Sequence, residues 1–177
     1  MEDADNEARS LPDDEEFCEL GECSPHVEGT TSYRVTDLVL HSTNDLTVLA
    51  EALQARGMRV MQRAIDCYRT AAGELMWVFQ GGFCGESFNS PEVEIAAMLA
   101  VVESLDPQAR ALWDNCSLRE FDFAYDCGVR PFAVHHDLSA GTMARLAAAA
   151  GSLRITLYAY DPGEIKTTES DAAPNPA

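Results

Sequence analysis

Lysine is almost absent from this chain of 177 residues, in which Lys166 stands against eleven arginines. A phosphate-binding loop of the GxxxxGK[ST] type needs a lysine beside its last glycine. The glycine-rich stretch GGFCGES at 81–87 has no such lysine, and no GxGxxG motif opens a helix. We therefore interpret this stretch as a flexible connector, and the sequence contains neither of these nucleotide-binding motifs.

Long hydrophobic runs are also missing from the sequence. No segment approaches the roughly 18 apolar residues that a membrane-spanning helix needs. The first residues contain no basic region followed by an apolar stretch, which a secretory signal would require. We therefore predict a cytoplasmic protein that does not contact membranes. A chain of this length can bury a hydrophobic core without disulfides or metals.

The six cysteines include no CxxC pair, so the commonest sequence sign of a zinc or redox site is absent. The nearest approach to a metal pattern is CxxxxCxxH, formed by Cys18, Cys23 and His26. A structural zinc site normally has four ligands, and this segment offers three. We therefore predict reduced thiols, several of them buried as small hydrophobic side chains, and no metal or other cofactor.

Acidic residues are abundant, and the formal net charge is −18. Residues 1–30 hold eleven acids against one arginine, a balance of −10, and residues 161–177 hold four acids against one lysine, a balance of −3. The middle of the chain, 31–160, holds fifteen acids and ten arginines, a balance of −5. A chain of this charge repels nucleic acid and attracts basic proteins.

Composition divides the chain into three regions. Residues 1–30 are polar and unpatterned, and they bury too little apolar surface to offset the entropy of ordering. We predict that they form a largely disordered acidic lead, and that 163–177 form a disordered tail for the same reason. Residues 31–162 then form a single folded domain.

Hydrophobic periodicity in the middle region predicts alternating strands and helices. Strands are predicted at 32–42, at the end of 58–70, and at 75–80, 117–127, 132–136 and 152–160. Helices are predicted at 44–57, at 91–115 as one broken helix or two helices, and at 139–151. The expected inner faces of these helices are Leu46, Leu49, Ala50 and Leu53; Ile95, Met98, Leu99 and Val102; and Met143, Leu146, Ala147 and Ala150.

The predicted order is β-α-β-β-α-β-β-α-β, which is typical of an α+β fold with a mostly antiparallel sheet and helices packed on one face. The strand at 117–127 alternates. Its inner face is Phe121, Phe123, Tyr125 and Cys127, and its outer, acidic face is Glu120, Asp122 and Asp126. The last strand alternates too, and Leu153, Ile155, Leu157 and Ala159 share a face.

The sequence offers no set of residues that points to catalysis. His135 and His136 are adjacent on a predicted strand, so their side chains would point to opposite faces and could not easily share a metal. Cys84 or Cys127 could serve as a nucleophile only beside a base, and Cys84 has no basic neighbour in the sequence. We therefore predict a protein that is not an enzyme, and we interpret Trp77 and Trp113 as core residues.

Several segments carry a resemblance to a known family: the helix from Pro91, FDFAYDCG at 121–128, the helix opened by Ser139, and LRITLYAYDPGE at 153–164. In these residues and in the order of its elements, the chain resembles a family of small bacterial domains of unknown function over about residues 33–162. That family has no established catalytic residues. Some similar small acidic bacterial proteins are immunity proteins encoded beside secreted toxins, so the resemblance implies a binding function.

Charge and resemblance together predict an immunity protein or inhibitor that covers the active surface of a basic toxin or nuclease. The candidate contacts are Asp13, Asp14, Glu15, Glu16, Glu120, Asp122 and Asp126. Three alternatives stay open. They are a phage-type nucleic-acid mimic that inhibits a host defence protein, a small enzyme that uses Cys84 or the His135 region, and a subunit that forms a homodimer through a sheet edge.

Overall fold

The structure, a computed structural model, describes residues 29–83 and 88–159, and for 61–66 the backbone alone. Its elements follow one another as β1 (Ser32–Ser42), α1 (Thr47–Gln54), β2 (Arg59–Arg69), β3 (Leu75–Gly82), α2 (Pro91–Glu103), α3 (Pro107–Asp114), β4 (Leu118–Asp126), α4 (Ala140–Ala148) and β5 (Ser152–Tyr158). The predicted lead and tail lie outside the described residues, apart from the last two residues of the lead.

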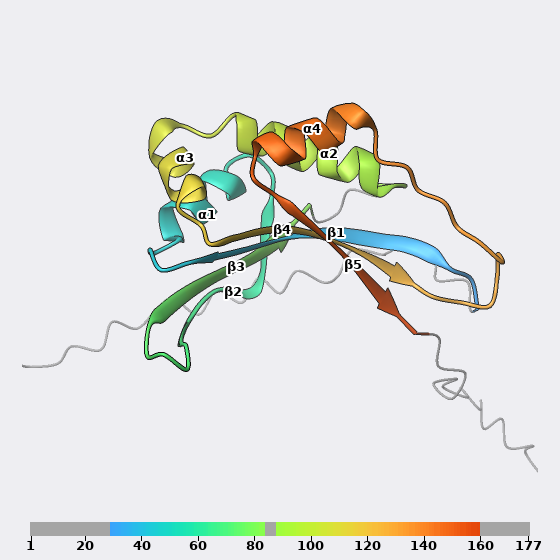
Figure 1. Ribbon diagram of the computed structural model, residues 1–177, viewed down its shortest axis with the longest axis horizontal. Coiled ribbons are helices and arrows are strands. Elements are labelled where there is room, and N and C mark those ends of the chain that lie inside the picture. Colours follow the sequence, from blue (N-terminus) through green and yellow to red (C-terminus); the bar gives the residue numbers. More distant parts are fainter. Residues whose placement is uncertain (1–28, 84–87, 160–177) are drawn as a thin grey trace, which may run out of the picture.

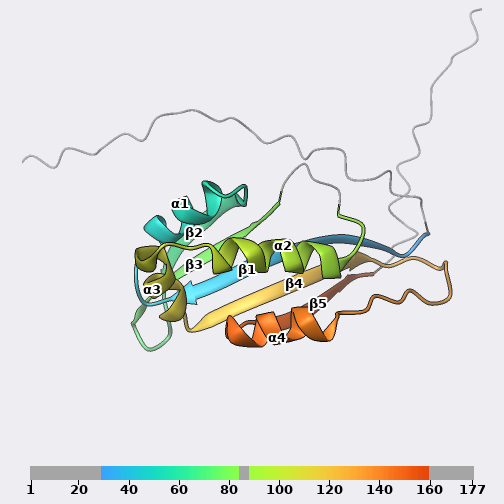
Figure 2. The same cartoon turned by 90° about the horizontal axis from the view of Figure 1, so that it is seen from above.

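The strands form one five-stranded sheet in the order β2-β3-β1-β4-β5. Strand β1 pairs antiparallel with β3 and β4, and β2 pairs antiparallel with β3. Strands β4 and β5 are the one parallel pair. All four helices lie over the same face of the sheet (Figures 1 and 2). The prediction of an α+β fold with a mostly antiparallel sheet is confirmed.

One predicted strand, 132–136, was wrong, because these residues form no helix or strand. Strand β5 pairs parallel with β4, and parallel neighbours must be joined by a crossover rather than a hairpin. Residues 127–139 begin that crossover. Pro131 has no amide donor for a sheet, and the side chain of Phe132 is 99% exposed. Residues 132–136 therefore have the composition of a strand, but no described strand is placed to pair with them.

The long helical segment is two helices, α2 and α3, which settles the alternative that the sequence left open. Asp106 caps α3, since its carboxylate accepts the amide hydrogens of Gln108 and Ala109, and Pro107 follows as the first helical residue. The predicted inner faces of α1 and α2 are confirmed, because all eight of their residues are fully buried.

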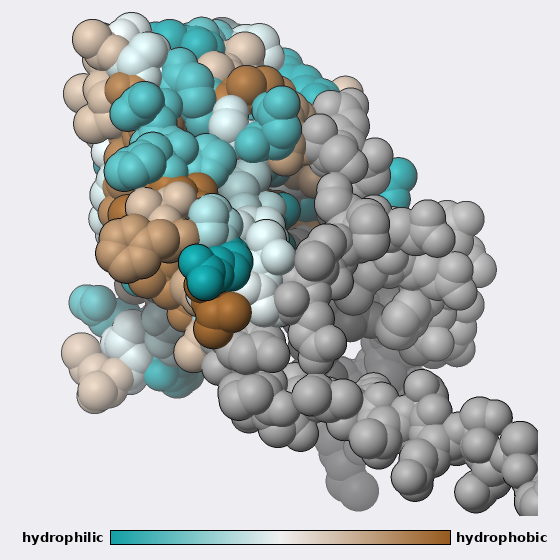
Figure 3. Space-filling model, turned by 90° about the vertical axis from the view of Figure 1, so that its right-hand side faces the viewer, coloured by the Kyte–Doolittle hydropathy of each residue, from teal (hydrophilic) through white to brown (hydrophobic). Residues whose placement is uncertain are grey.

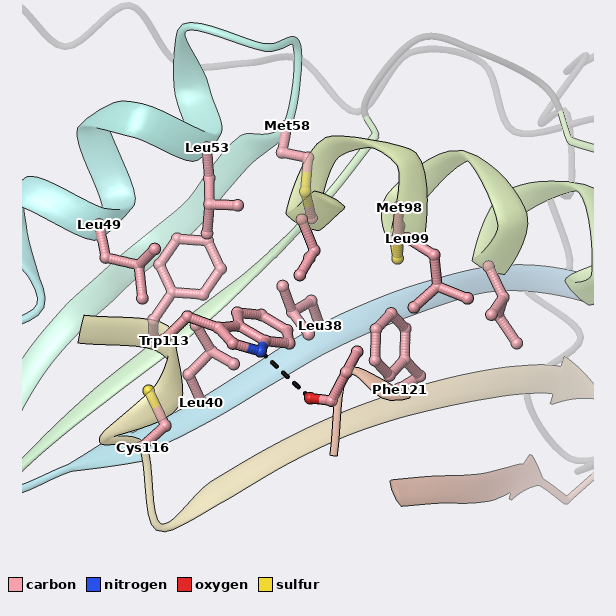
Figure 4. Packing of buried hydrophobic residues seen from close by; sticks show 14 of the residues in the cluster. Leu38, Leu40, Leu49, Leu53, Met58, Met98, Leu99, Trp113, Cys116 and Phe121 are labelled. Atoms are coloured by element: carbon pink, nitrogen blue, oxygen red, sulfur yellow. Dashed lines mark hydrogen bonds between the residues drawn. The ribbon is translucent and has the colours of Figure 1, made fainter. Parts of the chain in front are cut away.

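The hydrophobic core lies between the helices and the sheet (Figure 4). Trp113 of α3 lies at its centre and is fully buried, and its indole N–H donates to the carbonyl of Ala149 at 3.1 Å. This bond ties α3 to the residue that follows α4. The interpretation of Trp113 as a core residue is confirmed, whereas Trp77 is only half-buried.

Helix α4 is rotated from the predicted orientation. Its buried residues are Thr142 and Leu146, whereas Met143 is 43% exposed and Ala147 is also exposed. Polar contacts with α2 explain the difference. Glu92 of α2 accepts from the Thr142 hydroxyl at 2.7 Å and from the Ser139 amide at 3.0 Å. These bonds turn Thr142 inward and leave Met143 facing solvent.

Gly128 is a position where a side chain does not fit. A Cβ there would lie 2.2 Å from the backbone carbon of Gly29, so Gly128→Ala forces the two segments apart. We expect a loss of about 1–3 kcal/mol in the free energy of unfolding, measured by urea denaturation. The control is Gly141→Ala in α4, where the nearest atom would lie 3.6 Å away and alanine favours the helix. Equal stability of the two variants would contradict this prediction.

Candidate functional site

The predicted acidic residues that the structure describes lie together on the face of the sheet opposite the four helices, which we call the uncovered face because no described helix lies over it. Glu120, Asp122 and Asp126 alternate along β4 and point away from the helices, as the sequence predicted, because Phe121 and Phe123 between them are buried in the core. The other four candidates, Asp13, Asp14, Glu15 and Glu16, lie outside the described residues. The structure therefore groups three of the seven predicted contacts.

Each of these three carboxylates already has a partner on a neighbouring strand. Arg154 of β5 lies 3.0 Å from Glu120. Arg34 of β1 lies 3.2 Å from Asp126. These two ion pairs reduce the charge that the face presents to another molecule.

Asp122 is held in a different way, because both of its oxygens accept from the hydroxyl of Thr156, at 2.8 and 2.9 Å. Glu120 lies on the predicted outer face of β4 but is only 8% exposed. The pairing of β5 beside β4 explains it, since Arg154 comes from that strand.

The uncovered face of β1, β4 and β5 still carries more acids than bases. Asp37 of β1 pairs in register with Asp122 and lies on the same face. The face therefore holds four acidic residues, Asp37, Glu120, Asp122 and Asp126, and two basic residues, Arg34 and Arg154. Burial raises the pKa of Asp37, and the nearby charge of Asp122 acts in the same direction. The formal excess is two negative charges, so a basic partner would be favoured here.

Strand β5 lies at one end of the sheet and exposes apolar side chains. Ile155 is 60% exposed and Leu157 is 64% exposed, on the face that the helices cover elsewhere. Tyr158, on the opposite face, is 51% exposed, and its ring lies under the guanidinium of Arg34. We call residues 154–158 the β5 edge surface. Helix α4 lies above β5 in Figure 1, yet Ile155 and Leu157 stay more than half exposed.

The crossover loop lies at the same end of the molecule as the C-terminal end of β5 (Figure 1). It contributes two further exposed apolar residues, Val129 at 71% and Phe132 at 99%. Figure 3 faces this end and shows hydrophobic side chains beside hydrophilic ones on the described surface. Exposed apolar residues that gather beside polar ones are a feature of protein-binding surfaces.

A buried polar cluster, which sequence reasoning missed, lies between α2 and the start of β1. Glu94 of α2 is 2% exposed, and its carboxylate accepts from the hydroxyl of Tyr33 and, at 2.9 Å, from the amide of Thr36. The hydroxyls of Tyr33 and Thr36 are also hydrogen-bonded to each other. A signal was available, since Glu94 precedes the buried Met98 and Val102 by four and eight residues, which is the spacing of one helix face.

The cluster can hold or release a proton near neutral pH. Burial raises the pKa of Glu94 to about 7, and burial together with the bond to Glu94 raises the pKa of Tyr33. The ring of Tyr33 also contacts the rings of Tyr125 and His136. His136 is half-buried and His135 is exposed, and the two lie in a loop rather than in the predicted strand.

The described residues contain no group of three or more metal-binding side chains that could hold an ion. Cys84, Cys18, Cys23 and His26 lie outside them. No helix in the described part of the chain is long and apolar enough to cross a membrane.

Comparison with known proteins finds no protein family, no curated protein and no solved structure that matches this chain.

Proposed function

We propose that this chain is an acidic binding protein that captures a basic protein and neutralises it, as an immunity protein does with a toxin or a nuclease. The observation that carries the proposal is the β5 edge surface, where Ile155 and Leu157 are each more than half exposed on one face of an edge strand. The net charge of −18 supports a basic partner rather than an acidic one.

Charge and apolar contact would act at different steps of binding. Long-range attraction between opposite charges raises the association rate and depends on salt. Buried apolar contact lowers the dissociation rate, which accounts for most differences in affinity between related complexes. On this proposal, Asp13, Asp14, Glu15 and Glu16 serve the first step, and the β5 edge surface serves the second.

The cellular location and the kind of target follow the sequence-based prediction. The protein would act in the cytoplasm on a protein target. It would not bind nucleic acid directly, because phosphates repel a chain of this charge. We do not propose an enzyme, because the buried carboxyl of Glu94 is held by Tyr33 and Thr36 within the fold.

The test is capture from the lysate of the native host with the full chain as bait, followed by assay of the captured protein. We expect a basic protein that binds one to one, whose affinity falls as salt rises, and whose own activity is lost in the complex. A captured protein that stays fully active in the complex would overturn neutralisation. A captured acidic protein, or self-association of the bait alone by light scattering, would overturn the basic partner.

A further inference from the structure

We propose that the partner contributes an extended basic segment that pairs with β5 as a sixth strand of the sheet. This inference rests on the proposed function and adds to it the mode of recognition. It names the class of ligand: a strand in which basic and apolar residues alternate. Addition of a strand to an exposed sheet edge is a recurrent mode of peptide recognition.

The hydrogen bonds of β5 show which backbone groups face outward. The carbonyl of Tyr158 accepts from the amide of Cys127, directly after β4, so Tyr158 directs its backbone groups toward β4. The N–H and C=O of one residue point to the same side of a strand, and the side alternates along the chain. Ile155 and Leu157 therefore present their amides and carbonyls to the outer edge, as does Leu153.

Strand β5 has few of the features that protect an edge strand from pairing. Its sequence SLRITLY contains no proline and one charged residue, Arg154, which is paired with Glu120, and its register with β4 runs without a shift from Ser152 to Tyr158. Natural edge strands are commonly blocked by such residues or by a bulge. Among the described residues, β5 has one neighbouring strand, so its outer edge is open to another.

The side chains beside this edge define what the added strand must carry. On the face toward the helices, the new strand would meet Ile155 and Leu157, which favours apolar residues. On the other face it would lie beside Arg154, which is paired with Glu120, and beside Thr156 and Tyr158, one strand away from the acids of β4. Because side chains alternate between faces, the partner strand is expected to alternate apolar and basic residues.

Charge selects this occupant over a second copy of the chain. Each copy carries −18, so two copies repel each other, most strongly at low salt. A basic segment gains attraction from the same charge.

The experiment uses the full chain and synthetic peptides as long as β5. The first peptide alternates arginine with valine. The second alternates arginine with proline, which keeps the charge but removes half of the backbone donors and disfavours strand pairing. The third alternates glutamate with valine. We expect the arginine–valine peptide to bind at least about tenfold more tightly than either of the others.

Amide exchange provides a direct readout of the edge. The arginine–valine peptide is expected to slow the exchange of the Ile155 and Leu157 amides, which point outward, and to leave the Arg154 and Thr156 amides unchanged, because these already face β4. Equal binding of the arginine–valine and arginine–proline peptides would overturn the inference. So would unchanged exchange at Ile155 and Leu157 when the peptide is bound.

Variants separate the edge from charge alone. Ile155→Ser with Leu157→Ser is expected to weaken binding of the arginine–valine peptide about tenfold. Val93→Ser on α2, also half exposed, is the matched control and should leave binding unchanged. If a captured basic protein is neutralised equally by the double variant, the edge inference fails and the β5 edge surface has no part in binding, whereas neutralisation of a basic protein still stands. If the peptide binds as expected and no basic protein is neutralised, the proposed function fails alone.

Discussion

Replacing Trp113 with alanine is expected to lower the free energy of unfolding by about 4 kcal/mol, which is the usual cost of removing a large buried aromatic side chain. Trp113 is fully buried, and the residues around it come from β1 and from α1 (Figure 4). The change also removes the indole donor, so the carbonyl of Ala149 loses its partner. Urea denaturation followed by circular dichroism measures the effect.

Trp113→Phe separates packing from hydrogen bonding. Phenylalanine keeps most of the apolar volume but cannot donate to Ala149, so we expect an intermediate loss of about 2 kcal/mol. Trp77→Phe is the matched control, because Trp77 is half-buried at the side of the core and should lose less. Losses of the same size at both tryptophans would mean that Trp113 is not the centre of the core.

The sequence predicted the elements whose pattern is set by their own residues. The inner faces of α1 and α2 follow from apolar residues spaced by three and four, and β4 follows from strict alternation. A helix or a half-buried strand imposes these periods locally. The acidic face of β4 was therefore predicted residue by residue, as Glu120, Asp122 and Asp126 show.

The features that the sequence could not predict depend on distant partners. The stretch 132–136 has the composition of a strand, but β5 pairs with β4 in its place. The inner face of α4 was predicted correctly at Leu146 but not at Met143, because Glu92, more than forty residues earlier, turns Thr142 inward. The burial of Glu120 likewise depends on Arg154.

The β5 edge surface illustrates the same limit for the candidate site. Alternation correctly placed Leu153, Ile155 and Leu157 on one face. However, an edge strand and a central strand have the same period, so the pattern does not reveal that Ile155 and Leu157 are exposed. That property follows from the strand order, which places β5 last.

Glu94 is expected to make the protein less stable as pH rises, whereas a carboxylate with a lowered pKa has the opposite effect. Its pKa is about 7 in the folded chain against an ordinary value of 4.5, so the folded state binds this proton more tightly than the unfolded state. The stabilisation is fully present below pH 4.5 and is lost as pH rises toward and through 7. The full loss corresponds to about 3 kcal/mol. The pKa of the neighbouring Asp37 is raised too and adds to the same trend.

Glu94→Gln isolates this contribution, because glutamine does not titrate but can still accept from Tyr33 and Thr36. We expect the free energy of unfolding of the wild type, minus that of the variant, to fall by about 3 kcal/mol between pH 4.5 and 7.5. The measurement is urea denaturation at a series of pH values. A difference that stays constant over this range would show that Glu94 ionises as it does in the unfolded chain.

Glu92→Gln, two residues away, provides a control of opposite sign. Hydrogen bonds from the amide of Ser139 and the hydroxyl of Thr142 lower the pKa of Glu92, so its stabilisation is present at neutral pH and is lost as pH falls. The free energy of unfolding of the wild type, minus that of Glu92→Gln, should therefore grow as pH rises. The same difference for Glu94→Gln should shrink. The two differences in the free energy of unfolding are therefore expected to change with pH in opposite directions. This result would show that burial sets the pKa of Glu94 and that hydrogen bonding sets the pKa of Glu92, although both residues lie on one turn of α2.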